Sequence, residues 1–422
     1  MTRPFVVHID RENETVRINV ADEVAILEVG EFSEWMPIEF DVMGPFSKIS
    51  GITRFYLKAL EPHFQLYATP ININPGDPAL PISEPAGFTK NLYEKIGYYY
   101  TQGMPEDTKA FEWGIFTDAE FVKQTEIVFQ ERLAMLDAVL DDYNDGFLFF
   151  YFSSIDQTCH MLWRNMDPNH PGHTAENAKY GGRIEDLYTR MDSVLGSVRE
   201  RIPEDATLIV MSDHGFAPYY KKVNLNTWLY ENDFMTLRKP KEVGRSPLFR
   251  NVFWRRTKAY GLGINGLYVN LRGRESQGIV RPEEYDALVD EIAAKLLAYR
   301  DPETGEQVVK RVYRADQIYD GDALGKAPDI IVGYTAGYRG GDDSALGHLS
   351  KSVISLNMDK WSGDHCMAYE EVPGIFLSNR PLAIDDPNLT DMAVTILRLY
   401  GMEPPENMVG RSVFSVETLS SR

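Results

Sequence analysis

The sequence predicts an α/β fold in which a mostly parallel sheet is flanked by helices. Residues 147–152 form an unbroken apolar run, as expected of a strand that is buried on both faces. A second apolar run, residues 207–211, ends abruptly before Asp213-His214-Gly215. Between the two runs, apolar side chains recur at helical spacing over residues 184–198. This strand–helix–strand order implies a parallel pair of strands joined by a right-handed crossover.

The N-terminal part of the chain predicts a small antiparallel sheet. Short β-branched or aromatic runs are separated there by turn-prone residues such as Asn13 and Gly30. The runs span residues 6–9, 15–20, 24–29, 35–40, 49–60 and 63–73. A Pro- and Gly-rich passage at residues 74–87 predicts a linker. We therefore expect a β-rich subdomain over residues 1–80 and an α/β domain over residues 81–422, with an insertion at about residues 217–280.

The larger domain carries further helix and strand signals. Thr117 and Glu120 are spaced as a capping box and predict the start of a helix whose apolar positions run to Tyr143. Two later helices are predicted over residues 282–299 and 390–400. Two further buried strands are predicted over residues 329–333 and 374–378.

Composition excludes several classes of protein. The 422 residues are 43% hydrophobic and 25% charged, as in soluble globular proteins with a substantial core. The net charge of −20 argues against a nucleic-acid partner and against charge-driven membrane binding. An anionic substrate stays open because bound metal ions can reverse the local field. No run of about 18 apolar residues predicts a membrane span, and the start of the chain does not resemble a secretory signal, so a cytoplasmic location is the default expectation.

Acidic residues and histidines follow the predicted strands. Asp156 and His160 are four residues apart, so a helix would put both on one face. Asp213 and His214 directly follow the run at 207–211, and His365 precedes the predicted strand at 374–378. Carboxylates and imidazoles are ligands for Zn²⁺ and similar ions. Two mixed clusters in three segments at one edge of a sheet suggest two metal ions.

These motifs resemble those of a known family. The strings 153–160 (SSIDQTCH), 211–216 (MSDHGF) and 363–365 (GDH) are similar to the successive metal motifs of the alkaline phosphatase superfamily. The resemblance is to its type I phosphodiesterase/nucleotide pyrophosphatase branch. Further similar strings lie at residues 51–58, 103–108, 224–229 and 404–412. The resemblance implies an alkaline-phosphatase-like sheet and the hydrolysis of small phosphate esters.

The same resemblance implies a two-zinc site, with Mn²⁺ or another divalent ion as an alternative. Asp156, His160 and His365 would hold one ion, and Asp213 and His214 the other. Members of the family use in-line attack by a metal-activated Thr or Ser on a phosphoryl group, which gives a covalent intermediate that is then hydrolysed.

One expected motif is not found. In the family, a strand ending in a metal-binding Asp and followed by a Thr or Ser nucleophile lies upstream of the other motifs. Residues 6–10 end in Asp10, but the residues that follow predict a hairpin instead of a nucleophile-bearing helix. The chain thus resembles the carboxyl-terminal part of such an enzyme, and the catalytic nucleophile stays unassigned. We expect very low turnover, and the alternative is a non-catalytic metal- or partner-binding remnant of the fold.

Other residues receive structural interpretations. Cys159 and Cys366 are expected to pack as small buried side chains. His170 and His173 are expected in solvent, and His348 in an ordinary loop. A locally basic stretch is interpreted as a solvated surface, with an anion-attracting patch as the alternative. It contains Arg238, Lys239, Lys241, Arg245, Arg250, Arg255, Arg256 and Lys258.

Overall fold

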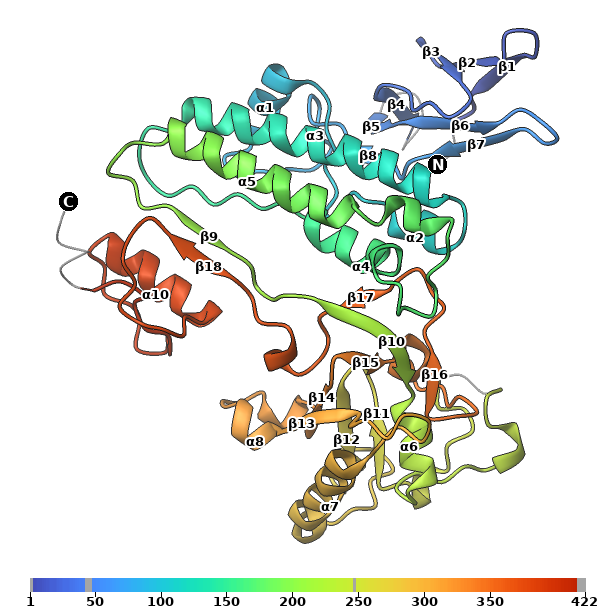
Figure 1. Ribbon diagram of the computed structural model, residues 1–422, viewed down its shortest axis with the longest axis vertical. Coiled ribbons are helices and arrows are strands. Elements are labelled where there is room, and N and C mark those ends of the chain that lie inside the picture. The colour runs from blue at the N-terminus through green and yellow to red at the C-terminus, as the bar shows by residue number, and fades with distance from the viewer. Residues whose placement is uncertain (1–2, 42–47, 246–247, 416–422) are drawn as a thin grey trace. The chain divides into compact units, whose positions relative to one another are not determined.

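Figure 1 shows the computed structural model, which describes residues 3–41, 48–245 and 248–415. The chain divides into two compact units. Unit 1 contains Met1–Thr158 and Asp186–Pro203, and unit 2 contains Cys159–Glu185 and Glu204–Arg422. Helix α4 (Ser154–Met166) and helix α5 (Arg183–Arg201) each run across a boundary between the units. Among the described helices, none combines the length and the hydropathy that a membrane span requires.

The β-rich part of unit 1 confirms the predicted antiparallel strands. β2 (Thr15–Val20) lies between β1 (Val6–Asp10) and β3 (Glu23–Glu28). Val16 and Ile18 of β2 are buried while Arg17 points to solvent, because successive side chains of a strand face opposite ways. The remaining strands of this unit are β4 (Met36–Asp41), β5 (Lys48–Thr53), β6 (Phe55–Ala59), β7 (Gln65–Ala68) and β8 (Asn72–Ile73). They form the small sheets β4-β5-β8 and β6-β7.

Helix α3 (Asp118–Asp142) of unit 1 begins where the sequence predicts. It starts with a capping box in which Thr117 and Glu120 each accept the other's backbone N–H. α5 lies beside α3 in Figure 1, and Arg190 of α5 pairs with Glu126 of α3 at 2.8 Å. The shorter helices of this unit are α1 (Phe88–Ile96) and α2 (Thr108–Glu112).

The predicted strand at residues 147–152 is wrong. This run adopts no strand, and Phe147, Phe149 and Tyr151 are each more than half exposed. Aromatic composition signals a strand only where a neighbouring strand pairs with the backbone, and none pairs with this run in the described structure.

Unit 2 contains several small sheets. β9 (Ile209–Met211) pairs with β18 (Phe376–Ser378), and this pair is antiparallel. A second sheet is centred on β10 (Ala217–Val223), which pairs with β15 (Gly337–Gly340), β16 (Ile354–Leu356) and β17 (Gly363–Asp364). A third has the order β11 (Ala259–Gly261), β12 (Gly266–Val269), β14 (Ile330–Tyr334) and β13 (Val309–Arg314).

Helices complete unit 2. α7 (Tyr285–Ala298) packs against β13, as Figure 1 shows, and its Ile292 is fully buried in the largest hydrophobic cluster of the unit. The other α-helices are α6 (Leu225–Glu231), α8 (Ala315–Ile318), α9 (Asp342–Ala345) and α10 (Leu389–Leu399). The 3₁₀ helices are η1 (Asn177–Tyr180), η2 (Pro240–Glu242), η3 (Trp254–Arg256), η4 (Pro282–Glu284), η5 (Leu324–Lys326) and η6 (Tyr369–Glu371).

The fold is therefore mixed α/β, and the expectation of a mostly parallel sheet is wrong for the described structure. Within the described ranges, the pair β10–β15 is parallel and the other strand pairs are antiparallel. The predicted parallel pair requires a first strand at residues 147–152, and this run forms none. In addition, β9 pairs with β18, which lies much later in the chain.

Candidate metal centre

Pairing between β10 and β17 brings two of the predicted motifs together. Ala217 lies opposite Asp364 in this antiparallel pair. His214 precedes β10 and His365 follows β17, so the antiparallel register puts both at the same end of the pair. Their rings stack with centroids 3.5 Å apart and an angle of 13° between the planes. Two histidines that are far apart in the sequence therefore share one small volume.

A glycine allows the third histidine to join them. A Cβ on Gly363 would lie 2.5 Å from the carbonyl oxygen of Cys159, so only glycine permits this approach of β17 to α4. His160, the next residue of α4, donates from Nδ1 to the carbonyl oxygen of Gly363 at 2.8 Å. In this tautomer Nε2 carries the lone pair of the ring. The ring centroids of His160 and His365 are 5.1 Å apart.

Asp213 and His214 present two donor atoms side by side. His214 donates from Nδ1 to the carbonyl oxygen of Gly215 at 3.1 Å, and its Nε2 lies 3.4 Å from Oδ2 of Asp213. Ligand atoms held at about 2.0–2.2 Å by a tetrahedral Zn²⁺ lie roughly 3.3–3.6 Å from each other, so this spacing fits a shared ion. Gly215 is needed in the turn because a Cβ there would lie 2.4 Å from the carbonyl oxygen of Pro373.

Asp156 lies on the same helix as His160. It is in the first turn of α4, one helical turn before His160, and this spacing puts both side chains on one face of the helix. Asp156 belongs to unit 1 and His160 to unit 2, because the boundary between the units falls within α4. The predicted role of Asp156 as a metal ligand stays a prediction.

The electrostatics of the centre favour neutral imidazoles. Burial lowers the pKa of His160 to about 4. Burial, followed by the nearby His214, also lowers the pKa of His365. Both rings are therefore neutral at pH 7, and neutral imidazole is the form that binds metal ions.

Asp364, His365 and Cys366 also lie close enough to hold an ion. Asp364, however, is already bound by donors of the protein, and it forms a buried ion pair with Arg339. Burial, together with the charge of Asp364, raises the pKa of the Cys366 thiol to about 12, whereas the thiolate is the form that binds metal. The nitrogen and oxygen donors of the predicted residues are thus the better match to a divalent ion.

Among the described residues, the two serines next to the proposed ligands are engaged by the backbone. Ser212, next to Asp213, uses its hydroxyl to accept the backbone N–H of Ile375 at 2.9 Å. Ser362 Oγ accepts the backbone N–H of Arg164 at 3.1 Å and donates to the carbonyl oxygen of His160 at 3.3 Å. Both hydroxyls therefore hold the backbone together. The predicted hairpin after Asp10 is confirmed, and that carboxylate accepts hydrogen bonds within the turn.

The other interpreted residues have mixed outcomes. Cys159 is buried as predicted. The expectation that His170 is in solvent is wrong. It is 2% exposed, its Nε2 donates to Tyr219 at 3.0 Å, and its Nδ1 accepts the backbone N–H of Gly172 at 3.0 Å. His173, also expected in solvent, is partly buried and donates from Nδ1 to the carbonyl oxygen of Arg164 at 2.8 Å.

His348 and the basic stretch lie at the surface. His348 lies in a loop and contacts Asp343 at 3.1 Å. The basic residues between Arg238 and Lys258 are all exposed, as both the solvated-surface interpretation and its anion-attracting alternative require. The sequence interpretation missed Arg339, Trp361 and Asp364, because their partners are set by the pairing of distant strands.

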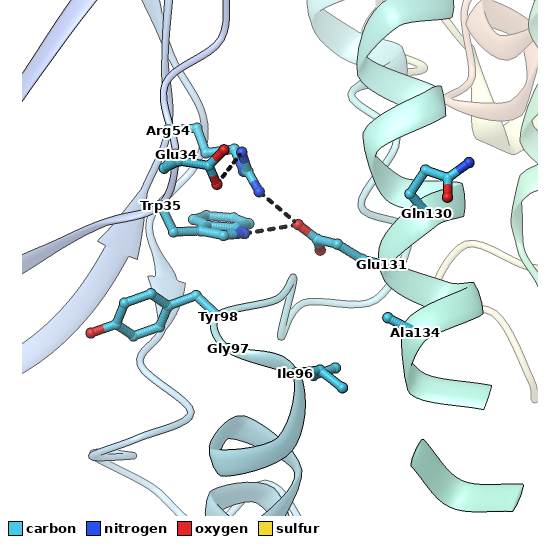
Figure 2. Close-up of a pocket in the computed structure, with 9 residues that line it drawn as sticks. All are labelled: Glu34, Trp35, Arg54, Ile96, Gly97, Tyr98, Gln130, Glu131 and Ala134. Carbon is cyan, nitrogen blue, oxygen red and sulfur yellow. Dashed lines mark hydrogen bonds and ion pairs between the residues drawn. The ribbon is translucent and has the colours of Figure 1, made fainter. Parts of the chain in front are cut away.

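Unit 1 holds a separate pocket of about 370 Å³, shown in Figure 2. Glu131 is its central residue and accepts Trp35 Nε1 at 2.8 Å and Arg54 Nη2 at 3.1 Å. Burial raises the pKa of Glu131 despite these donors. Because Glu131 is bound by the protein's own groups, we interpret this cluster as structural.

Taken together, unit 2 presents an α/β scaffold with a cluster of nitrogen and oxygen donors suited to divalent metal ions. Residues 83–345 match the family model for type I phosphodiesterase / nucleotide pyrophosphatase, and the chain belongs to this family. The family is part of the alkaline phosphatase superfamily, acts on phosphate esters and generally uses divalent metals. The matched region contains Asp156, His160, Asp213 and His214, and it ends before His365. Comparisons with curated proteins and with solved structures gave no match.

Proposed function

We propose that this chain is a divalent-metal-dependent hydrolase of small phosphate esters, of the phosphodiesterase/nucleotide pyrophosphatase type. The observation that carries the proposal is the convergence of His160, His214 and His365 from three separate segments, with Asp213 beside them. Membership of the family supplies the class of reaction.

The proposed ligands are Asp156, His160 and His365 for one ion, and Asp213 with His214 for the other. Support comes from the proximity of the His160 and His365 rings and from the 3.4 Å contact between Asp213 and His214. Zn²⁺ is the proposed ion, with Mn²⁺ as the alternative. When bound, two such ions would stabilise the charge on the attacking and leaving oxygens of an in-line displacement.

The protein's own groups prepare this site before any ion binds. The hydrogen bond from His160 to Gly363 fixes the tautomer of the ring and directs Nε2 as the donor atom. Burial keeps the rings of His160 and His365 neutral, so no proton must leave them when a cation arrives. We expect turnover to be slow, because the hydroxyls of Ser212 and Ser362 are engaged by the backbone and no nucleophile is assigned.

Hydrolysis of bis-p-nitrophenyl phosphate tests the proposal. The purified chain is assayed with added Zn²⁺ or Mn²⁺ and with a chelator, beside His365→Asn and Asp213→Ala. His348→Asn is the matched control, because His348 is a loop histidine whose described ion-pair partner is Asp343 and not a proposed ligand. We expect slow, metal-dependent hydrolysis in the wild type and the control, and its loss in both site variants. Activity that survives both substitutions or the chelator would contradict the proposal.

The second candidate is a non-catalytic metal- or partner-binding protein. It is favoured by one observation, namely that the two serines beside the proposed ligands are held in backbone hydrogen bonds. Metal analysis combined with the hydrolysis assay separates the two candidates. A chain that holds stoichiometric Zn²⁺ through His365, yet hydrolyses the ester no faster than His365→Asn, would support the non-catalytic role.

A further inference from the structure

A buried ion pair lies directly behind the candidate metal centre. Arg339 Nε lies 2.8 Å from Oδ2 of Asp364, and the two side chains are 5% and 1% exposed. The N–H of Arg339 is not aligned with this contact, so the attraction is electrostatic and not a hydrogen bond. Arg339 is also held by Asp342 at 2.6 Å and lies over the ring of Tyr219. Arg339 is thus fixed on several sides.

Asp364 connects this pair to the proposed ligands. Its Oδ1 accepts the backbone N–H groups of His365 at 2.7 Å and Cys366 at 2.8 Å. Its Oδ2 accepts the indole N–H of Trp361 at 2.6 Å. The indole ring in turn lies against His160, with centroids 3.8 Å apart. One carboxylate therefore fixes the backbone that carries His365 and the ring that packs on His160.

We propose that Arg339 and Asp364 are positioning residues, which hold His365 and His160 in the geometry that a divalent cation requires. This inference rests on the proposed function, because it assigns these histidines to a metal. Asp364 accepts three hydrogen bonds and faces a guanidinium, so it acts behind the ligands and does not bind the ion itself. Partners of this kind orient metal ligands, and their loss typically weakens metal binding about 10–100-fold.

A second ion pair of unit 2, buried on its carboxylate side, offers a comparison. Arg274 Nη2 lies 2.6 Å from Oδ2 of Asp329, which is 4% exposed, and Asp329 also accepts the backbone N–H of Val269 at 2.6 Å. Substituting Arg274, whose side chain is 23% exposed, therefore removes a partly buried pair without touching the proposed ligands. A purely structural role for Arg339 predicts that Arg339→Met and Arg274→Met both lose stability and both leave metal binding unchanged.

The test measures Zn²⁺ affinity by competition with a chromophoric chelator for the wild type, Arg339→Met and Arg274→Met. Asp364→Asn is the second variant, because it keeps an acceptor for the two backbone N–H groups while removing the charge that faces Arg339. We expect affinity about 10–100-fold weaker in Arg339→Met and Asp364→Asn. We expect wild-type affinity in Arg274→Met.

Hydrogen exchange without metal provides an independent readout. In the metal-free protein, the amides of His365 and Cys366 should exchange faster in Arg339→Met than in Arg274→Met, because their acceptor is no longer held. Wild-type Zn²⁺ affinity in Arg339→Met or in Asp364→Asn, or unchanged exchange of these amides in Arg339→Met, would overturn the inference alone. A wild-type chain that binds no Zn²⁺ would overturn the proposed function itself, and the inference with it.

Discussion

Replacing Gly363 by alanine tests the close approach of β17 to α4. The new Cβ would lie 2.5 Å from the carbonyl oxygen of Cys159 and 2.9 Å from Cε3 of Trp163. An ordinary contact begins at 3.4 Å, so the gap must open by about 0.9 Å. Opening along that contact would stretch the 2.8 Å hydrogen bond from His160 to Gly363 to about 3.7 Å, beyond a useful length.

The expected cost combines overpacking with a weakened hydrogen bond, about 2–4 kcal/mol of unfolding free energy. In a domain of this size, that lowers Tm by roughly 4–16 °C. Thermal unfolding followed by circular dichroism measures the fall, and chelator competition measures the accompanying loss of Zn²⁺ affinity. Gly325→Ala is the control, since its Cβ would meet nothing within 4 Å. Equal Tm values for Gly363→Ala and Gly325→Ala would refute the reasoning.

Three further predictions concern stability. Burial raises the pKa of Glu106, so the folded state loses stability as the pH rises above the ordinary pKa of 4.5. Glu106→Gln should therefore have a higher Tm than the wild type at pH 7, and this advantage should be gone near pH 4. A Tm difference that does not change with pH would contradict this prediction. Ile292 is fully buried, so Ile292→Ala should cost about 2–5 kcal/mol in urea unfolding at unchanged m value, and a loss below about 1 kcal/mol would mean that the site collapses around the deletion. Removing Zn²⁺ with a chelator should lower the Tm of the wild type but leave that of His365→Asn unchanged. If free Zn²⁺ was present at 100 times its Kd, the wild type should lose about 2.7 kcal/mol of unfolding free energy. Equal Tm shifts in both proteins would place the ion elsewhere.

Local signals in the sequence predicted local structure well. The alternation over residues 15–20 became β2, and the Thr117–Glu120 capping box begins α3, because both depend on neighbouring residues. The strand prediction for residues 147–152 was wrong because a strand also needs a neighbouring strand to pair with, and composition does not reveal that neighbour. The parallel sheet inferred from it failed for the same reason.

The candidate site shows the same division. Motif spacing singled out Asp156, His160, Asp213, His214 and His365, and the structure brings the three histidines together. Arg339 and Asp364 carried no such signal. Arg339 lies in β15 and Asp364 in β17, and both strands pair with β10. The contact between the two residues therefore depends on pairing between segments that are far apart in the chain. Long-range strand pairing thus determines which residues hold the proposed ligands in place, and this pairing could not be predicted from the sequence alone.

X-ray absorption at the zinc edge of the Zn²⁺-loaded chain tests the central claim most directly. The proposed ligands predict nitrogen and oxygen neighbours at about 2.0–2.2 Å with imidazole scattering, reduced in His365→Asn. Cys366 lies beside His365, so an alternative site there would add sulfur at about 2.3 Å. A spectrum with imidazole and no sulfur is the predicted result. A sulfur neighbour, or a spectrum unchanged in His365→Asn, would contradict the account.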